Sequence, residues 1–122
     1  MRHLEKEDVQ QKLPEVIGWL KKRKSIPNEN EEKFRREIIN VLGKLGDNSA
    51  VIPLSEILNE GALFKANLLI RTKEAALNAL AEIGTPEAIE ALNQATQHKD
   101  QFVASTAQKV LKKFEKETAE SP

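Results

Sequence analysis

The feature that most constrains this chain is a helix–turn–helix pattern that occurs twice, 38 residues apart. Residues 34–58 align with residues 72–96, and the glycine that would end the first helix of each unit falls at Gly46 and Gly84. The main apolar positions also coincide, Leu42 with Leu80 and Leu54 with Leu92. Repetition at a fixed period of this length is typical of stacked repeat units, so the sequence predicts an array of helix pairs.

Helical spacing of apolar residues extends on both sides of the two units. Asn30 is the expected N-cap of the first repeat, Asp47 or Asn48 of its second helix, and Thr85 of the helix that begins at Pro86. Pro14 predicts either a kink or a break into two short helices near residues 11–13. We expect helices at about 4–24, 31–45, 49–59, 69–83, 86–97 and 101–116, then a frayed polar tail at 117–122.

These elements fit one domain, because 122 residues can enclose one continuous core but not two ordinary ones. The predicted fold is an all-α, right-handed α-solenoid of about six helices. End units need polar outer faces, so the first and last helices would be caps. A piece of a longer solenoid is the alternative. The single domain 1–122 would consist of an N-terminal cap (1–25), a repeat (31–60), an insertion (61–70), a second repeat (71–98) and a C-terminal cap (101–117).

Composition narrows the classes of function. Lys plus Arg and Asp plus Glu number 19 each, so the chain lacks the net field that usually attracts nucleic acid or an anionic membrane. The absence of cysteine removes disulfides, thiolate zinc sites and cysteine nucleophiles. We expect no secretory leader, because residues 1–6 are charged and no apolar run follows them, and we expect no membrane span, because no apolar run approaches the necessary length. The expected location is the cytoplasm.

Residues that could carry catalysis are sparse. His3 and His98 lie at opposite ends of the chain, and there is no tyrosine, phosphate-binding glycine loop or Gly-x-Ser-x-Gly motif. Carboxylates are expected on polar helix faces, in places one turn from a cation, as Glu32 is from Arg36. We therefore expect no enzyme, no metal site and no cofactor.

Residues 34–47, Phe-Arg-Arg-Glu-Ile-Ile-Asn-Val-Leu-Gly-Lys-Leu-Gly-Asp, resemble a HEAT-like repeat of the short bacterial kind that also occurs in phycobilisome lyases. In the second unit Lys73 stands at the arginine position, while Thr72, Ala81 and Thr85 depart from the pattern. The resemblance implies that an arginine and an aspartate, here Arg35 and Asp47, tie one repeat to the next. The residues expected to be structural are Arg35, Leu42, Gly46, Asp47, Leu54, Leu80, Gly84 and Leu92.

An array of this kind would use the second helix of each unit to line its concave side. We therefore expect a scaffold or adaptor that binds another protein. Trp19 would either cover the edge of the core or be an exposed anchor. Phe64 lies in an apolar stretch, 63–70, that either packs on the repeats or forms a patch. The candidate binding residues are Trp19, Ser55, Glu56, Asn59, Phe64, Glu90, Asn93, Gln94 and Gln97.

Two other functions stay open at this stage. The family resemblance alone suggests a phycobilin lyase or a subunit accessory to one. The basic stretch 21–36, with Lys21 to Lys24, Arg35 and Arg36, could contact phosphates, although its composition favours a solvated helix end. It lacks the interspersed aromatic residues that stack on bases, so nucleic-acid binding is not favoured.

Overall fold

The computed structural model describes residues 13–22, 29–61 and 66–120, and the statements below concern these residues. Their regular secondary structure is entirely helical, which confirms the predicted all-α class. The elements are α2 (Leu13–Lys22), α3 (Glu29–Leu45), the 3-10 helix η1 (Asn48–Ala50), α4 (Val51–Ile57), α5 (Ala66–Ile83), α6 (Pro86–Ala95) and α7 (Gln101–Glu120).

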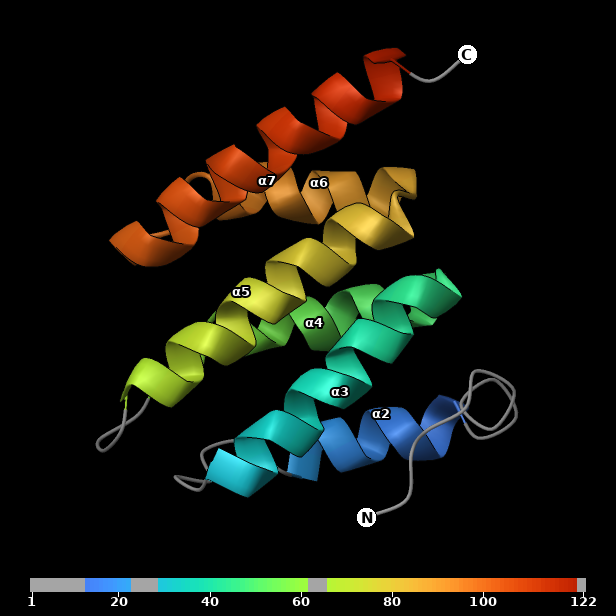
Figure 1. The fold of residues 1–122 in the computed structure, drawn as a ribbon, viewed down its shortest axis with the longest axis vertical. Helices are drawn as coiled ribbons and strands as arrows, with labels where there is room; N and C mark the ends of the chain where they lie inside the picture. Colours follow the sequence, from blue (N-terminus) through green and yellow to red (C-terminus); the bar gives the residue numbers. More distant parts are fainter. Residues whose placement is uncertain (1–12, 23–28, 62–65, 121–122) are drawn as a thin grey trace.

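The helices form two layers (Figure 1). α3, α5 and α7 lie side by side in the front layer, and α2, α4 and α6 lie behind them. The chain runs along a front helix, returns along a rear helix and advances in the same direction each time, which makes a right-handed solenoid. The most extensive contact joins α3 to α5, so the two units stack chiefly through their first helices.

One apolar core runs through the stack, from Val16 on α2 to Leu111 on α7. Leu42, Leu54, Leu80 and Leu92, the four leucines that the repeat aligns, have no exposed surface. Burying a leucine contributes about 1.5–3 kcal/mol relative to leaving it in water. The aligned positions are therefore the residues that hold each helix pair against the next.

The first helices of the two repeats, α3 and α5, approach each other closely where Gly43 faces Ala79. A Cβ atom on Gly43 would lie 3.0 Å from both the Cα and the Cβ of Ala79, closer than side chains normally pack. The absence of a side chain at Gly43 thus allows the backbones of α3 and α5 to come together. This contact sets the spacing between successive units in the front layer.

The corner of each unit is built on a glycine with positive φ, at 73° for Gly46 and 65° for Gly84. After Gly46, the Oδ1 of Asp47 accepts hydrogen bonds from the Ser49 backbone N–H (2.8 Å) and hydroxyl (2.7 Å). After Gly84, the Oγ1 of Thr85 accepts from the Ala88 N–H at 3.2 Å, and Pro86 begins α6. The first corner thus passes through the 3-10 turn η1, whereas the second enters an α-helix directly.

The expected start of the helix at about residue 69 was wrong, because α5 begins at Ala66. The apolar run there contains three adjacent large residues, which obscured its helical period. Leu68 is buried one turn before Thr72 and points inward, whereas Ile70 is 43% exposed. Residues 66–70 therefore form the first turn of α5.

Other predicted helix ends also differ from the structure. α3 begins at Glu29, so Asn30, the expected N-cap, lies inside the helix. α4 and α6 each end two residues early, at Ile57 and Ala95, because their last turns tighten to 3-10 hydrogen bonds. α7 continues to Glu120, so the expected frayed tail is helical for most of its length. The first cap is described only from Leu13, and most of the region expected to kink lies outside the described residues.

An ion pair with a buried basic residue closes the open end of each unit. Arg35, only 4% exposed, donates from Nη1 to the Oε1 of Glu60 at 2.7 Å, and its Nη2 bonds the other carboxylate oxygen. In the second unit Lys73 contacts Asp100 with Nζ 3.3 Å from Oδ2. The expectation that Arg35 and Asp47 tie one repeat to the next was wrong, because Arg35 bonds Glu60 of its own repeat and Asp47 accepts hydrogen bonds from Ser49. The arginine joins the two helices of its own repeat.

Glu32 was expected on a solvated face and is instead 5% exposed. Its carboxylate lies 2.8 Å from the Nε of Arg36 and accepts a hydrogen bond from the Thr72 hydroxyl at 2.9 Å. Thr72 belongs to α5, so this bond crosses between the repeats. The departure from the repeat pattern at Thr72 therefore supplies a polar link at the α3–α5 contact.

Substituting the corner glycine tests the repeat geometry. Gly84→Ala should lower the free energy of unfolding by about 1–2 kcal/mol, because an L side chain is strained at positive φ. Gly18→Ala is the matched control: it lies within α2 with no atom near its Cβ, and should stabilise by about 0.5–1 kcal/mol. Urea denaturation measures both changes. Equal stability of wild type and Gly84→Ala would contradict the assigned corner.

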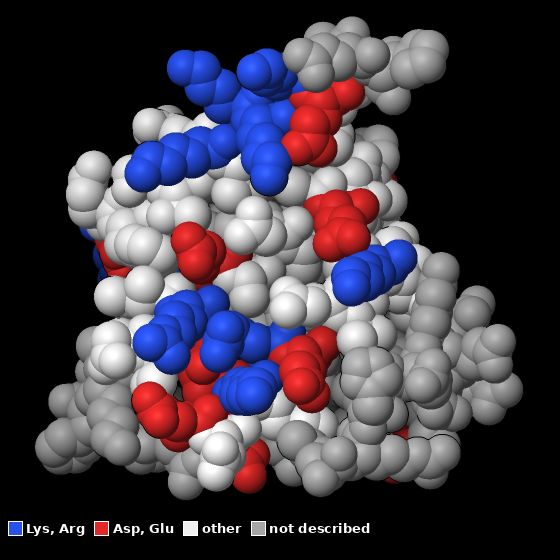
Figure 2. Space-filling view, viewed as in Figure 1, with Lys and Arg blue, Asp and Glu red and all other residues white. Residues whose placement is uncertain are grey.

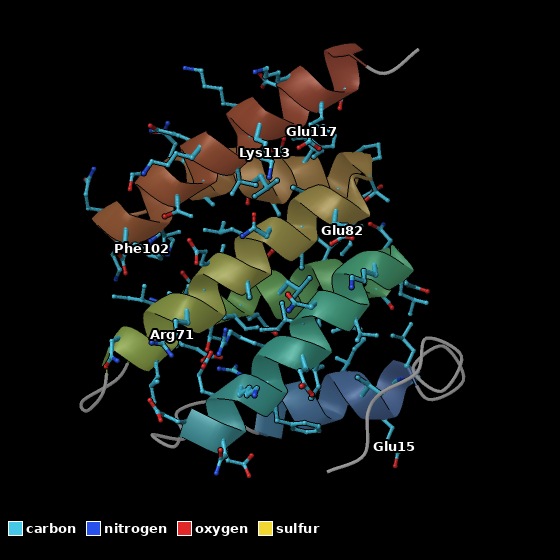
Figure 3. The ribbon with its side chains drawn as sticks, in the orientation of Figure 1. Glu15, Arg71, Glu82, Phe102, Lys113 and Glu117 are labelled. Atoms are coloured by element: carbon cyan, nitrogen blue, oxygen red, sulfur yellow. The ribbon has the colours of Figure 1, made fainter. Side chains whose placement is uncertain are left out.

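The Arg35–Glu60 ion pair should contribute far more to the free energy of unfolding than an ion pair on the surface. Glu60→Gln leaves a buried guanidinium without its counter-charge and should cost about 3 kcal/mol of unfolding free energy. Glu117→Gln is the control, because Glu117 lies 3.9 Å from Lys113 on the exposed face of α7 (Figure 3) and its loss should cost under about 0.5 kcal/mol. Equal changes in the two variants would show that the buried pair is not a structural tie.

Candidate functional site

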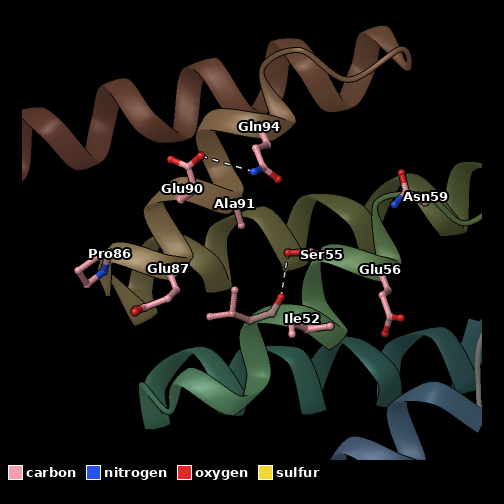
Figure 4. Close-up of a pocket in the computed structure, with 10 residues that line it drawn as sticks. Ile52, Ser55, Glu56, Asn59, Pro86, Glu87, Glu90, Ala91 and Gln94 are labelled. Atoms are coloured by element: carbon pink, nitrogen blue, oxygen red, sulfur yellow. Dashed lines mark hydrogen bonds between the residues drawn. The ribbon is translucent and has the colours of Figure 1, made fainter.

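An open groove lies between α4 and α6, the second helices of the two repeats (Figure 4). Its volume is about 580 Å³ and its surface is mostly apolar. One wall comes from α4 and the turn that follows it, and the other comes from α6. The lining residues are Val51, Ile52, Ser55, Glu56, Asn59, Pro86, Glu87, Glu90, Ala91 and Gln94.

Ile52 is the most exposed large apolar side chain of the described residues, with 71% of its surface in solvent. The neighbouring Val51, Leu54 and Ile57 are buried on the inner face of α4. Ile52 follows Val51 by one residue and is therefore rotated about 100° around the helix, away from that face. Nothing in the core requires an isoleucine here, and its side chain is placed at the groove instead.

Polar groups surround this apolar surface. The Ser55 hydroxyl donates to the Val51 carbonyl at 2.8 Å, and the Gln94 amide donates to the Glu90 carboxylate at 3.4 Å. Glu56 and Glu87 are exposed and form no ion pair with another described residue. The carboxylates of the groove are therefore free to meet an external group.

Hydrogen bonds between the repeats bracket the groove at both ends. At the N-terminal ends of the two helices, the Thr85 hydroxyl donates to the Oδ1 of Asn48 at 2.7 Å. At the other end, the Nε2 of His98 lies 2.8 Å from the Oδ1 of Asn59. The Nδ1 of His98 accepts from the Asp100 N–H at 2.9 Å, so the ring proton is on Nε2, which donates to Asn59.

The structure brings together five of the nine residues expected to bind a partner. Ser55, Glu56 and Asn59 line one wall of the groove, and Glu90 and Gln94 line the other. Asn93 and Gln97 are exposed on or after α6 but do not line it. The side chain of Trp19, and Phe64 as a whole, lie outside the described residues.

Sequence reasoning missed the apolar part of the groove: Val51, Ile52, Pro86 and Ala91, together with Glu87. The contacts expected on the second helices are all polar and do not include this apolar surface. A signal for Ile52 was nevertheless present, because it falls outside the 3–4 spacing of Val51, Leu54, Ile57 and Leu58. An apolar residue off the buried stripe of a short helix indicates exposure.

Other kinds of site have less support from the described residues. Arg35 is buried on Glu60, and Arg36 pairs with Glu32, so neither guanidinium stands free for a phosphate. The side chains of Lys21 to Lys24 lie outside the described residues. Within the described residues, no three potential ligands are grouped closely enough for a metal ion, and no helix is long and apolar enough to span a membrane.

The ion pair near the end of the groove should be visible in the titration of Asp100. Partial burial is the largest single influence and raises the pKa of Asp100. Hydrogen bonds from the Phe102 N–H, Lys73 and the Val103 N–H, with the positive charge of Lys73, together hold this pKa below its ordinary value. A carboxyl group whose pKa is lowered by folding stabilises the folded state at pH values above its unfolded-state pKa. This stabilisation is lost as the pH falls through the folded-state pKa. Lys73→Met removes the hydrogen bond and the positive charge that lower the pKa of Asp100, so this pKa should rise.

An NMR titration of the side-chain carboxyl carbons measures this change. Asp47 is the internal control, because its pKa is lowered chiefly by the hydroxyl of Ser49 and then by the Ser49 N–H. Its pKa should be the same in the wild type and in Lys73→Met. An unchanged or lower pKa of Asp100 in the variant would contradict the role given to Lys73.

Comparison with known proteins identifies the repeated unit. The family model described as the PBS lyase HEAT-like repeat matches residues 34–60 and residues 72–98. Comparisons with curated proteins and with solved structures found no match. The matched segments contain α4 and α6, and hence both walls of the groove. The two stacked helix pairs of this chain are PBS lyase HEAT-like repeats.

Proposed function

We propose that this protein is a non-catalytic interaction scaffold that holds a segment of a partner protein in the groove between α4 and α6. The observation that carries the proposal is Ile52, an isoleucine that lines a mostly apolar groove and has 71% of its surface in solvent. Exposed apolar surface with a polar border is typical of interaction sites.

The architecture supports the same function. Helical repeats bury the inner faces of their helices by stacking and leave the second helices as a continuous surface. In this chain α4 and α6 present the groove, whereas the first helices are occupied in the α3–α5–α7 stack. A partner bound in the groove would therefore contact both repeats at once.

The two alternatives have weaker support. A phycobilin lyase, or a subunit accessory to one, is suggested by the family description and by no residue of the groove. Nucleic-acid binding through residues 21–36 would have to rely on Lys21 to Lys24, since Arg35 and Arg36 are engaged by carboxylates. Interaction with a protein is the function that the described surface favours.

Affinity capture from a native lysate tests the proposal, with Ile52→Ala compared with Ile70→Ala. Both residues are exposed isoleucines, but Ile70 is on α5 and does not line the groove. A partner that uses the groove should be recovered about tenfold less by Ile52→Ala, as expected for loss of an interface anchor worth about 1.4 kcal/mol.

Recovery by Ile70→Ala should match the wild type. Equal recovery by Ile52→Ala and by the wild type would exclude this groove as the binding surface. Far-UV circular dichroism of each variant establishes that the helices are intact before capture is compared.

A further inference from the structure

The zero net charge of the chain conceals a strong separation of charge between the two kinds of helix. No lysine or arginine occurs between Lys44 and Lys65, or between Lys73 and Lys99. The first interval contains η1 and α4, and the second contains most of α5 and all of α6. The second helices of both repeats therefore carry negative charge without any positive charge of their own.

Most other cations of the described residues belong to α3, α5 and α7 in the front layer, and Lys21 and Lys22 at the end of α2 are exceptions. Figure 2 shows the face formed by α3, α5 and α7, where lysine side chains gather over α7 and basic side chains lie among acidic residues lower down. Lys109, Lys112, Lys113 and Lys116 are exposed on α7. Arg35 and Lys73, the basic residues at equivalent positions of the two repeats, are buried and paired with Glu60 and Asp100.

Three carboxylates border the groove. Glu56 comes from α4, and Glu87 and Glu90 come from α6, so acidic groups stand on both walls. Glu90 has a hydrogen bond only from the neutral amide of Gln94 among the contacts of the described residues. Like charges held near an apolar surface, without internal counter-ions, repel an acidic partner and attract a cationic one.

The apolar surface of the groove sets a second requirement for the occupant. Ile52 would remain exposed beneath a purely charged ligand, so the occupant needs an apolar side chain to cover it. The length of α6, ten residues, corresponds to about 15 Å. A partner helix of about three turns, or about five residues of extended chain, matches that length.

We infer that the groove between α4 and α6 binds a cationic peptide segment of a partner protein, in which lysine or arginine side chains meet Glu56, Glu87 and Glu90 while an apolar side chain covers Ile52. This inference rests on the function proposed above and specifies the chemistry of the partner. It also predicts which substitutions weaken binding through charge and which through loss of apolar contact.

Binding of a synthetic peptide tests the inference directly. The probe is a fluorescein-labelled peptide of about three helical turns, with lysines on one face and leucines on the other. Its twin carries glutamate in place of every lysine. Fluorescence anisotropy with the intact protein should show that the lysine peptide binds, that its affinity falls steeply as salt is raised, and that the glutamate peptide binds at least about tenfold more weakly.

Charge-neutral variants locate the binding. Glu56→Gln, Glu87→Gln and Glu90→Gln combined should lower the affinity for the lysine peptide by about tenfold or more and flatten its salt dependence. The matched control removes three exposed carboxylates elsewhere, through Glu74→Gln, Glu82→Gln and Glu115→Gln, and should change affinity less than about twofold. Glu82 is on α5, in the front layer and away from the groove (Figure 3).

Several results would overturn the inference. They are failure of the lysine peptide to bind, equal binding of the two peptides, and equal loss in the two triple variants. Self-association of the protein that the groove triple abolishes would also overturn it, since the occupant would then be a second copy. Sedimentation velocity at the same concentrations detects that case.

The result for the proposed function is read separately. If capture of the native partner depends on Ile52 but is unaffected by the groove triple, the groove binds a protein and the cationic chemistry is wrong. If capture does not depend on Ile52, the proposed function itself fails at this groove. If both Ile52→Ala and the groove triple weaken capture while the control triple does not, both are supported.

Discussion

The whole structure depends on how closely α3 and α5 can approach each other. Two helices of this length bury their apolar faces only if their backbones come near enough for side chains to interlock, and at Gly43 and Ala79 the backbone of one helix nearly touches the other. Around this point Leu42 and Leu80 are fully enclosed. Because α4 and α6 are attached to these helices through tight corners, the spacing of the front layer also determines the spacing of the rear one.

Polar residues then specify how the stack is assembled. The apolar leucines are nearly interchangeable between repeats and would tolerate a shift by one unit, but the polar links differ from unit to unit. Glu32 pairs with Thr72, Arg35 with Glu60, and Lys73 with Asp100. Buried polar groups are costly unless they find a partner, so the Glu32–Thr72 bond favours one stacking of α5 on α3, and the two ion pairs hold each unit closed. The two repeats are therefore alike in their core and individual in their polar contacts.

The sequence was informative wherever a residue acts through its own local chemistry. The glycines at positive φ, the cap at Thr85 and the buried leucines all follow from spacing and residue type. It was uninformative where the deciding partner lies far along the chain. The burial of Glu32 depends on Thr72, forty residues later, and the partner of Arg35 proved to be Glu60 rather than Asp47. The start of α5 was misplaced because three adjacent apolar residues hide which one, Leu68, faces inward.

The groove also combines features that local sequence predicts with features that depend on residues far apart in the chain. Its polar members could be anticipated because they project from the second helices, but its shape arises only when α4 and α6 are set side by side. The two hydrogen bonds at its ends, from Thr85 to Asn48 and from His98 to Asn59, join almost equivalent positions of successive repeats. Any rocking of one repeat on the other that widens the groove must stretch one of these bonds or both. The two hydrogen bonds thus oppose widening of the groove. A ligand that fits the existing width binds without the free-energy cost of deforming the solenoid.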